Sequence, residues 1–399
     1  KRNKLSEVYH FIEKDLLEAV PVLKERDNLP NGEIGRASKG AARALLAKVY
    51  LFESSYWKNY SGDSRFEGCE NHYSDALKYA EDVINSGKYE LVGINGERWN
   101  SWWNSLQNGG IGGFRYIFTV DGDNSKESVF ECQNVQDGKG WSLTRGSYLT
   151  IYTTIRYAID KNGAEQQLGW SFLLPTSYLV SSFGNKDNRE TGLSTVNQEK
   201  YDETLDPRFK VTVGREGDTV NGAVPRGSVT ADEWLKMSFR NLPTGTICRK
   251  YECSAQEYWI PMAGRHQEGP MNVKIIRYAD VVLIAAEAAF ELNQKDKALN
   301  YVNMVRTRAR MSGNTGYPKD LTSVTFEDIM HERRLEFAGE CHRFFDLVRW
   351  NKAYDFINGI NLASGFDNVQ FVKGKHEFFP IPASEVRKSG GALEQNPNW

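Results

Sequence analysis

The chain has 399 residues, 40% of them hydrophobic, so it is long enough to bury a large core in one extended domain or two smaller ones. Its 50 basic and 52 acidic residues give a formal net charge of −2, so we predict no nucleic acid partner, because the basic surface that binds a phosphate backbone is lacking. No stretch approaches the roughly 20 apolar residues of a membrane-spanning helix.

The N-terminal part of the chain predicts three helices. Apolar residues recur with a period of 3.6 residues over 4–23, where Pro21 kinks or ends the helix. Ser38 is placed to cap a second helix that runs to about residue 54 and is rich in alanine and leucine. A third helix is predicted over 72–86, with Gly87 just after its end.

The middle of the chain, residues 88–272, lacks helical periodicity and is predicted to be loop-rich. Ser128–Cys132 is predicted to form a short strand, and Thr176–Phe183 a short helix after Pro175. Long ordered segments without regular structure usually carry function. We therefore expect ligand binding in this region.

Helical periodicity returns over Val273–Leu292, and a second helix is predicted over 295–310. The short connection between them requires an antiparallel hairpin. Another pair of helices is predicted over Thr325–Gly339 and Cys341–Phe356. The tail His376–Trp399 contains three prolines and is predicted to be extended and to lie across the helices.

A weak internal repeat relates the two helical parts of the chain. Ala47–Leu51 with Asp75–Leu77 resembles Ala286–Phe290 with Lys297–Leu299. Small residues and an aromatic on one helix, followed by Ala-Leu on the next, are typical of tetratricopeptide-type pairs. The predicted fold is therefore mainly α, with tetratricopeptide-like helix pairs forming a scaffold and a large loop-rich irregular region.

Three groups of residues resemble catalytic or metal sites, and each has a simpler interpretation. Glu332 and Glu336 lie one helical turn apart and so resemble the paired carboxylates of a glycoside hydrolase, but the arginines beside them favour a buried ionic network. His331 and His342 are too far apart for a zinc protease motif. Asp121–Asn124 offers oxygen ligands for calcium without EF-hand spacing. We predict no catalytic residue, no metal site and no cofactor.

The charged residues of the C-terminal helices are predicted to be structural. Arg343, Asp346 and Arg349 are three residues apart and share one helix face. Arg277 and Asp280 repeat this spacing. Partly buried ion pairs of this kind are expected to fix helix register.

Five cysteines spread along the chain do not form the pattern of a disulfide-rich secreted domain. Cys248 and Cys253 are close enough in sequence to pair, although free thiols are the simpler interpretation. Cys341 and the adjacent His342 point about 100° apart on a helix, so a thiol nucleophile with its base is not predicted there.

Four segments resemble motifs of the SusD/RagB family. They are, in chain order, Gly35–Tyr50, Ile275–Asp280 with Ala286–Ala288, Glu332–Trp350, and Phe378–Pro382 with Glu385 and Gln395–Pro397. The four stand in the family's order and cover nearly the whole chain. The resemblance implies one SusD-like domain over 1–399. In it, 1–87 and 273–360 form the helical scaffold, 88–272 the loop-rich ligand-binding region and 361–399 an extended C-terminal tail.

The resemblance also implies a function. A protein of this family is expected to be a lipoprotein on the outer membrane, exposed at the cell surface, that binds an oligo- or polysaccharide. It is expected to deliver this glycan, without catalysis, to a SusC-like TonB-dependent transporter. We expect the signal peptide and the lipid anchor to lie outside residues 1–399. Two alternatives stay open: a glycoside hydrolase, and a helical-repeat module that binds a peptide or another protein.

Tryptophans of the loop-rich region are the predicted glycan-binding residues. Trp99, Trp102 and Trp103 lie within five positions and alternate with Asn and Ser side chains that suit sugar hydroxyls. Three indoles on one irregular segment cannot easily all face the core, because each buried N–H needs a partner. Trp141, in a glycine-rich segment, is the fourth candidate, whereas Trp350 lies in a motif helix and is predicted to be structural.

Overall fold

The computed structural model describes residues 2–30, 32–100, 110–135, 146–160, 162–167, 169–183, 206–215, 218–221, 234–238, 245–252, 269–313, 316–361 and 367–399. Within these ranges the regular structure is mostly helical and the strands are short, so the predicted mainly α fold is confirmed. None of the helices in the described ranges is both long enough and apolar enough to cross a membrane.

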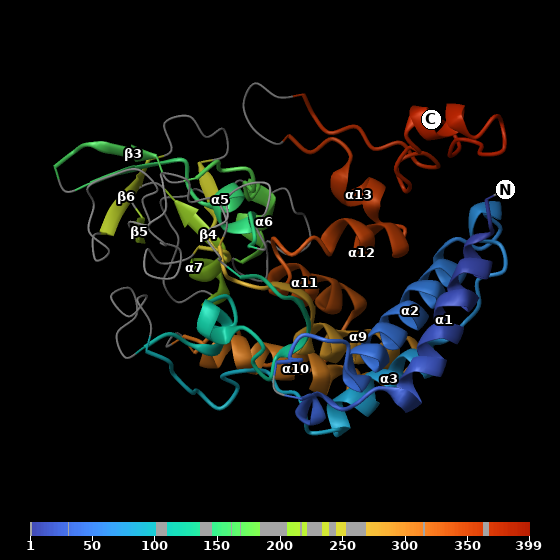
Figure 1. The fold of residues 1–399 in the computed structure, drawn as a ribbon, viewed down its shortest axis with the longest axis horizontal. Helices are drawn as coiled ribbons and strands as arrows, with labels where there is room; N and C mark the ends of the chain where they lie inside the picture. Colours follow the sequence, from blue (N-terminus) through green and yellow to red (C-terminus); the bar gives the residue numbers. More distant parts are fainter. Residues whose placement is uncertain are drawn as a thin grey trace.

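Five long helices form the scaffold of the described chain (Figure 1). They are α1 (Leu5–Val22), α2 (Lys39–Asn59), α3 (Tyr73–Asn85), α9 (Tyr278–Glu291) and α10 (Lys295–Met311). Successive helices pack on one another, α1 on α2, α2 on α3, and α9 on α10. Because α3 also packs on α9, helix pairs far apart in the sequence join into one helical scaffold.

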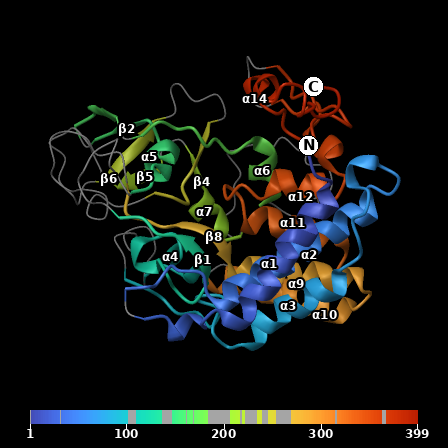
Figure 2. The ribbon, with the colours of Figure 1, turned by 45° about the vertical axis from the view of Figure 1, so that its right-hand side comes forward.

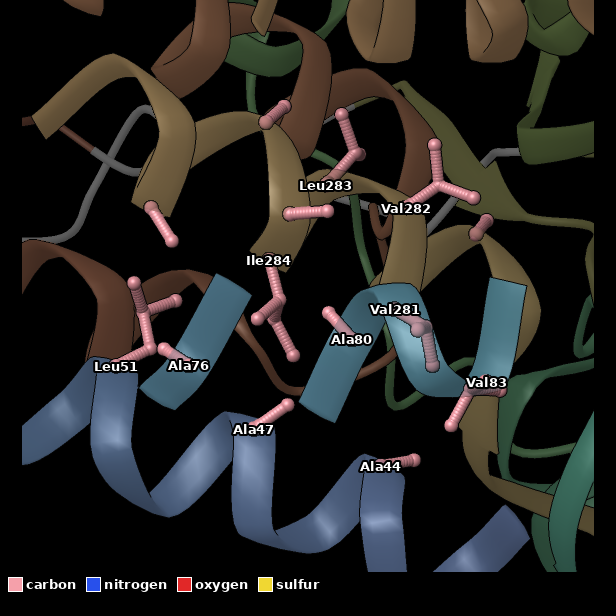
Figure 3. Close-up of a cluster of buried hydrophobic side chains, with 14 of the residues drawn as sticks. Ala44, Ala47, Leu51, Ala76, Ala80, Val83, Val281, Val282, Leu283 and Ile284 are labelled. Atoms are coloured by element: carbon pink, nitrogen blue, oxygen red, sulfur yellow. The ribbon is translucent and has the colours of Figure 1, made fainter. Parts of the chain in front are cut away.

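The core between α2, α3 and α9 combines buried alanines with branched residues on all three helices (Figure 3). Ala47 of α2 and Ala80 of α3 are fully buried, and Ile284 points toward both of them from α9. Methyl side chains let the helix backbones approach closely, so the larger Ile284 fills the space between them. Most residues of α9 are buried, as expected for a helix surrounded by others.

Local capping signals place the start of α2 and the end of α3 where the sequence predicts them, whereas α2 runs to Asn59, beyond the predicted residue 54. The Ser38 side chain accepts a hydrogen bond from the backbone N–H of Ala41 at 3.2 Å, which caps α2. Gly87, two residues after the end of α3, has a φ of 65°. This left-handed conformation favours glycine and ends the helix.

The prediction of one helix over 273–292 is wrong in its first turn. Val273–Arg277 forms strand β8, which pairs antiparallel with β1 (Ser128–Cys132), and α9 begins only at Tyr278. The predicted strand at Ser128–Cys132 is confirmed. Residues such as Ile276 suit a helix or a strand equally, and the partner strand, far away in the sequence, decides between them.

The prediction of one helix over 341–356 is also wrong. Its residues form α12 (Arg343–Arg349) and α13 (Ala353–Ile357), which follow α11 (Phe326–Glu336). Asn351 interrupts the run with a φ of 54°, a left-handed conformation that asparagine tolerates better than most residues. The interruption turns α13 away from the direction of α12.

Short elements make up the described part of the loop-rich region; β1 packs on α2, whereas the elements from α5 to β7 lie away from α1, α2 and α3 (Figures 1 and 2). Thr176 caps the predicted short helix, which is confirmed as α6 (Ser177–Ser182). The other α-helices described in this region are α4 (Gly113–Tyr116), α5 (Leu149–Thr153) and α7 (Arg208–Thr212). A four-stranded sheet has the order β3 (Glu165–Gln167), β2 (Tyr157–Ile159), β6 (Trp234–Ser238), β5 (Thr219–Asn221), and β4 (Val213–Arg215) pairs with β7 (Thr246–Cys248).

The C-terminal tail packs over the helices, as predicted, but is not wholly extended. It contains the short helix α14 (Ala383–Lys388). Phe378 stacks on Phe66 with ring centroids 5.6 Å apart, and Phe379 lies equally close to Phe344 of α12. These ring contacts hold the tail against the α2–α3 connection and against α12.

Candidate functional site

A network of buried ion pairs surrounds Glu336 near the end of α11. Its carboxylate accepts hydrogen bonds from Arg277 at 2.9 Å, from Arg208 at 3.0 Å and from Arg308. Arg277 and Arg308 also bond to Glu127, which precedes β1. All five side chains are buried. The network therefore ties α7, α10, α11 and the β1–β8 pair to one another.

Two of the three predicted contacts between charged neighbours differ in the structure. Asp346 and Arg349 pair at 2.9 Å, as predicted. Arg343 instead donates to the backbone carbonyl of Met330. Arg277 and Asp280 do not pair, because the boundary between β8 and α9 falls between them and their side chains engage different parts of the network.

The paired carboxylates Glu332 and Glu336 are structural in this arrangement. Glu332 is fully buried and pairs with Arg208 at 2.6 Å and with Arg306 at 3.0 Å. Burial alone would raise the pKa of Glu336, but the adjacent Arg308 and other cations outweigh burial and hold this pKa well below its usual range. A glycosidase acid needs a raised pKa and access to the sugar. The prediction of a structural network is confirmed for this pair.

His342 lies beside the same network, and its burial makes the free energy of unfolding of the protein depend on pH. Burial lowers the pKa of His342 to about 4 in the folded protein, whereas a histidine in an unfolded chain has a pKa of about 6.5. The unfolded chain therefore binds this proton more readily, and stability falls as the pH falls from about 6.5 toward 4. We expect this group to lower the free energy of unfolding by about 2 kcal/mol between pH 6.5 and pH 4.5.

Denaturant unfolding at pH 6.5 and 4.5, compared between the wild type and His342→Gln, measures this contribution. Carboxylates with depressed pKa values, such as Asp346, also lose stabilising charge at low pH, but they do so in both proteins. The difference between the two pH dependences therefore reports His342 together with its electrostatic effect on neighbouring carboxylates such as Asp346. An identical pH dependence in the variant would contradict the prediction.

Four aromatic side chains gather on the loop-rich region around α5. We call Tyr148, Tyr152, Trp170 and Phe172 the aromatic platform. The Tyr152 ring lies at its centre, with centroid distances of 5.7 Å to Tyr148, 5.1 Å to Trp170 and 5.7 Å to Phe172. Phe172 is 68% exposed, and the other three rings are half-buried. The result is a continuous aromatic surface that solvent reaches.

Backbone hydrogen bonds fix the segment that carries Trp170 and Phe172. The Trp170 N–H donates to the Ile151 carbonyl at 2.9 Å, and the Phe172 N–H donates to the Tyr152 carbonyl at 2.7 Å. Ser171 between them is buried and has a left-handed φ of 56°. With Ser171 turned inward, the two flanking rings reach the surface, and α5 holds them in register with Tyr152.

Gly169 permits this close approach of the segment to α5. A Cβ atom at Gly169 would lie 2.5 Å from the Thr154 carbonyl oxygen and 2.8 Å from that of Ile151. Neither backbone oxygen can move aside like the end of a flexible side chain. The glycine is therefore part of what positions the platform.

Of the four tryptophans predicted to bind glycan, the structure describes Trp99. Trp102, Trp103 and Trp141 lie outside the described residues. Trp99 is half-buried, exchanges backbone hydrogen bonds with Ile111 at 3.0 and 2.9 Å, and stacks on Tyr116 with ring centroids 4.4 Å apart. Its ring thus packs at the edge of an apolar cluster rather than on the aromatic platform.

The sequence did not predict the platform residues. The alternation Trp170-Ser171-Phe172, directly after Gly169, was the available signal, because a period of two places both rings on the same side. Residues near Tyr152 gave no such signal, since a helix as short as α5 shows no periodicity.

Two other candidates from the sequence analysis are the possible calcium ligands at 121–124 and the possible disulfide between Cys248 and Cys253. In the calcium candidate, Asp123 pairs with Lys274 at 2.5 Å and is engaged within the protein. Cys248 is a free, buried thiol, and Cys253 lies outside the described residues.

Comparison with known proteins identifies the family. The sequence model of the SusD family matches residues 126–399. The chain belongs to the SusD family. A SusD-like protein P2 of Formosa agariphila is 29% identical over 404 residues, covering 99% of this chain and 65% of the relative. A SusD-like protein of Bacteroides ovatus is 26% identical over 357 residues, covering 87% and 51%. This SusD family chain thus spans between half and two thirds of the length of these relatives.

Solved SusD-like structures share the fold. A SusD-like protein from Bacteroides fragilis has a TM-score of 0.69 at 24% identity, covering 98% of this chain and 71% of that protein. A laminarin-binding SusD-like protein has a TM-score of 0.65 at 25% identity, covering 99% and 69%. Surface glycan-binding protein A from Bacteroides thetaiotaomicron, in complex with laminarihexaose, has a TM-score of 0.65 at 23% identity, covering 97% and 70%. The resemblance found in the sequence is confirmed.

The SusD-like motifs of this chain build its scaffold. Arg277 and Asp280 of the second motif, and Glu336 and Arg349 of the third, are all buried in ion pairs. The aromatic platform lies outside all four motifs. In this SusD family protein the aromatic platform is therefore carried by segments between the motifs.

Proposed function

We propose that this protein binds a glycan on the aromatic platform at the cell surface and passes it, chemically unchanged, to a SusC-like TonB-dependent transporter. The observation that carries the proposal is the platform itself. Four adjoining rings stay accessible because backbone hydrogen bonds hold them at the surface. Sugars present apolar C–H faces to aromatic rings, and a rigid set of rings binds them at low entropic cost.

The relatives support a glycan as the ligand class. Solved structures of this fold include a laminarin-binding SusD-like protein and a surface glycan-binding protein with bound laminarihexaose. Laminarihexaose is therefore the first probe to use. The linkage and the sugar that this chain prefers depend on its own loops.

Binding without catalysis distinguishes this proposal from a glycoside hydrolase. The carboxylate pair that the sequence singled out, Glu332 and Glu336, is buried in arginine contacts. A glycan array followed by calorimetry identifies the ligand, and chromatography of the incubated glycan measures turnover. We expect saturable binding with the ligand recovered intact. Turnover by the purified protein, absent from a preparation made in the same way from cells that lack it, would contradict the proposal.

The predicted tryptophans extend the proposed site. Trp141 precedes Tyr148 of the platform by only seven positions in the sequence, and Trp102 and Trp103 follow Trp99 within four positions. We expect Trp102→Ala combined with Trp103→Ala to weaken binding of the cognate glycan at least tenfold, about 1.4 kcal/mol, with little change in the melting temperature. Calorimetry measures the affinity. Wild-type affinity in the folded double variant would exclude Trp102 and Trp103 from the site.

Delivery and anchoring complete the proposal. The SusC-like transporter, the lipid anchor and the cell-surface location follow from what proteins of this family are expected to do. Co-purification of the full-length protein with a TonB-dependent transporter from outer membranes tests the partnership. If the protein binds the glycan but does not co-purify with a transporter, the proposed glycan binding stands and the proposed delivery to the transporter is contradicted.

One observation favours peptide binding as a second candidate function. An apolar groove of about 680 Å³ lies between α6, α12 and α13, and Phe344 and Phe379 line it together with Arg334 and Arg343. Within the described part of the chain, neither arginine pairs with a carboxylate. A peptide with an acidic and an aromatic residue would fit this chemistry. Binding of such peptides, measured beside the glycan array, discriminates between the two functions.

A further inference from the structure

Three helices bring Glu13, Glu53 and His72 together at a site far from the aromatic platform in the sequence. Glu13 lies on α1, Glu53 on α2, and His72 immediately precedes α3. One potential ligand atom from each residue lies within 4.8 Å of the other two. The sequence predicted no metal here, because forty residues separate the two glutamates and no short motif marks the group.

The polar atoms of this group are buried without hydrogen-bond partners. Glu53 is 0% exposed, and the Glu70 backbone N–H lies near its carboxylate, but neither carboxylate oxygen has a hydrogen bond of good geometry. Oε1 of Glu13, which is 8% exposed, and Nε2 of His72 are unpartnered in the same way. Buried polar atoms are normally satisfied, so a cluster of four that face one another points to a missing ligand.

The orientation of His72 matches that of a metal-binding histidine. Its Nδ1 atom lies 3.4 Å from the Asp75 carboxylate, so a proton on Nδ1 would be held there. Its Nε2 atom lies 3.8 Å from the carboxylates of both Glu53 and Glu70. Ligand atoms around a tetrahedral zinc ion are about 3.4 Å apart. The potential ligand atoms here lie within 4.8 Å of one another, so small side-chain movements would bring them to the distances of a zinc coordination shell.

We propose that Glu13, Glu53 and His72 bind a divalent cation of the zinc type, with Glu70 as a fourth ligand from the solvent side. Two carboxylates supply the negative charge that such a cation needs, and the imidazole favours zinc over calcium or magnesium, which prefer oxygen ligands only. The ion would tie α1 to the α2–α3 hairpin. This role is separate from glycan binding.

The same residues have a metal-free alternative. Burial raises the pKa of Glu53 to about 8, and the adjacent Glu13 carboxyl raises it further in the same direction. The two glutamates could thus share one proton near neutral pH. This state leaves His72 Nε2 unsatisfied, whereas a cation would engage all three side chains.

Calorimetric titration of the metal-free protein with zinc chloride at pH 7 tests the proposal. We expect one saturable site and a rise in melting temperature of at least about 3 °C at saturating zinc. Glu53→Gln and His72→Gln should each weaken binding at least tenfold and abolish the rise. Glutamine has the shape of glutamate and removes a buried charge, so Glu53→Gln is expected to fold even if its metal-free stability changes.

Glu18→Gln is the matched control, because Glu18 is an exposed carboxylate on the same helix as Glu13. It should bind zinc as the wild type does. The proposal is overturned if the wild type shows no saturable zinc site, or if Glu53→Gln and His72→Gln bind zinc as tightly as the wild type. Calcium binding equal to that of zinc would overturn the assignment of the cation.

Discussion

Replacing Glu336 by glutamine is expected to lower the free energy of unfolding by about 3–5 kcal/mol, the cost typical of breaking a buried ion pair. Glu336 is fully buried and accepts hydrogen bonds from Arg208, Arg277 and Arg308, which come from three different elements. Removing its charge leaves three guanidinium groups in the interior with less compensation. Their solvation in water is already lost, so the folded state bears the whole penalty.

Guanidinium chloride unfolding of the variant and the wild type measures the change, provided that the denaturant dependence stays the same. Glu385→Gln is the control, because Glu385 forms an exposed pair with Lys388 and exposed pairs contribute little. We expect a small effect for the control and a large one for Glu336→Gln. Equal, small effects would mean that the buried network does not hold the helices and loops together.

Removing two rings of the aromatic platform is expected to abolish most of the glycan affinity. Trp170→Ala combined with Phe172→Ala deletes both rings that flank the buried Ser171 and leaves Tyr152 without its neighbours on that side. We expect at least a hundredfold loss of affinity, about 2.7 kcal/mol, because aromatic anchors dominate binding surfaces of this kind. Since Phe172 is largely exposed, we expect only a small change in the melting temperature of the variant. The loss of affinity would then not be caused by unfolding.

Phe11→Ala is the matched control for this variant. Phe11 is 65% exposed on α1, almost the same as Phe172, but it lies on the helical scaffold. Calorimetry with the glycan identified on the array compares the three proteins. An unchanged affinity in Trp170→Ala/Phe172→Ala, or an equal loss in Phe11→Ala, would exclude the platform as the binding surface.

We expect the buried network to determine stability and the aromatic platform to determine ligand preference. Ion pairs such as Arg349 with Glu287 and Asp346 lie among the helices, where charge removal is costly and little variation is tolerated. The platform is held by backbone hydrogen bonds to α5, so its side chains can change without disturbing what positions them. We expect ligand preference to respond to substitutions on the platform, and stability to respond to substitutions in the network.

The sequence by itself determined the features that depend on neighbouring residues. The 3.6-residue periodicity placed α1, α2, α3 and α10, and the Ser38 and Thr176 side chains marked where two helices begin. The motifs from Gly35 to Pro397 indicated the family. These signals depend on residues that are near one another in the sequence or on the order of motifs along it. They can therefore be recognised without knowing the tertiary structure.

Tertiary structure alone decided the features that depend on distant partners. Val273–Arg277 became a strand because β1 offers an edge to pair with, and this change separated Arg277 from Asp280. The platform exists because Gly169 lets one segment reach α5. Periodicity reports which side of an element is buried, whereas only the fold determines which residues meet there. The group of Glu13, Glu53 and His72 arises in the same way, from three helices that no sequence motif connects.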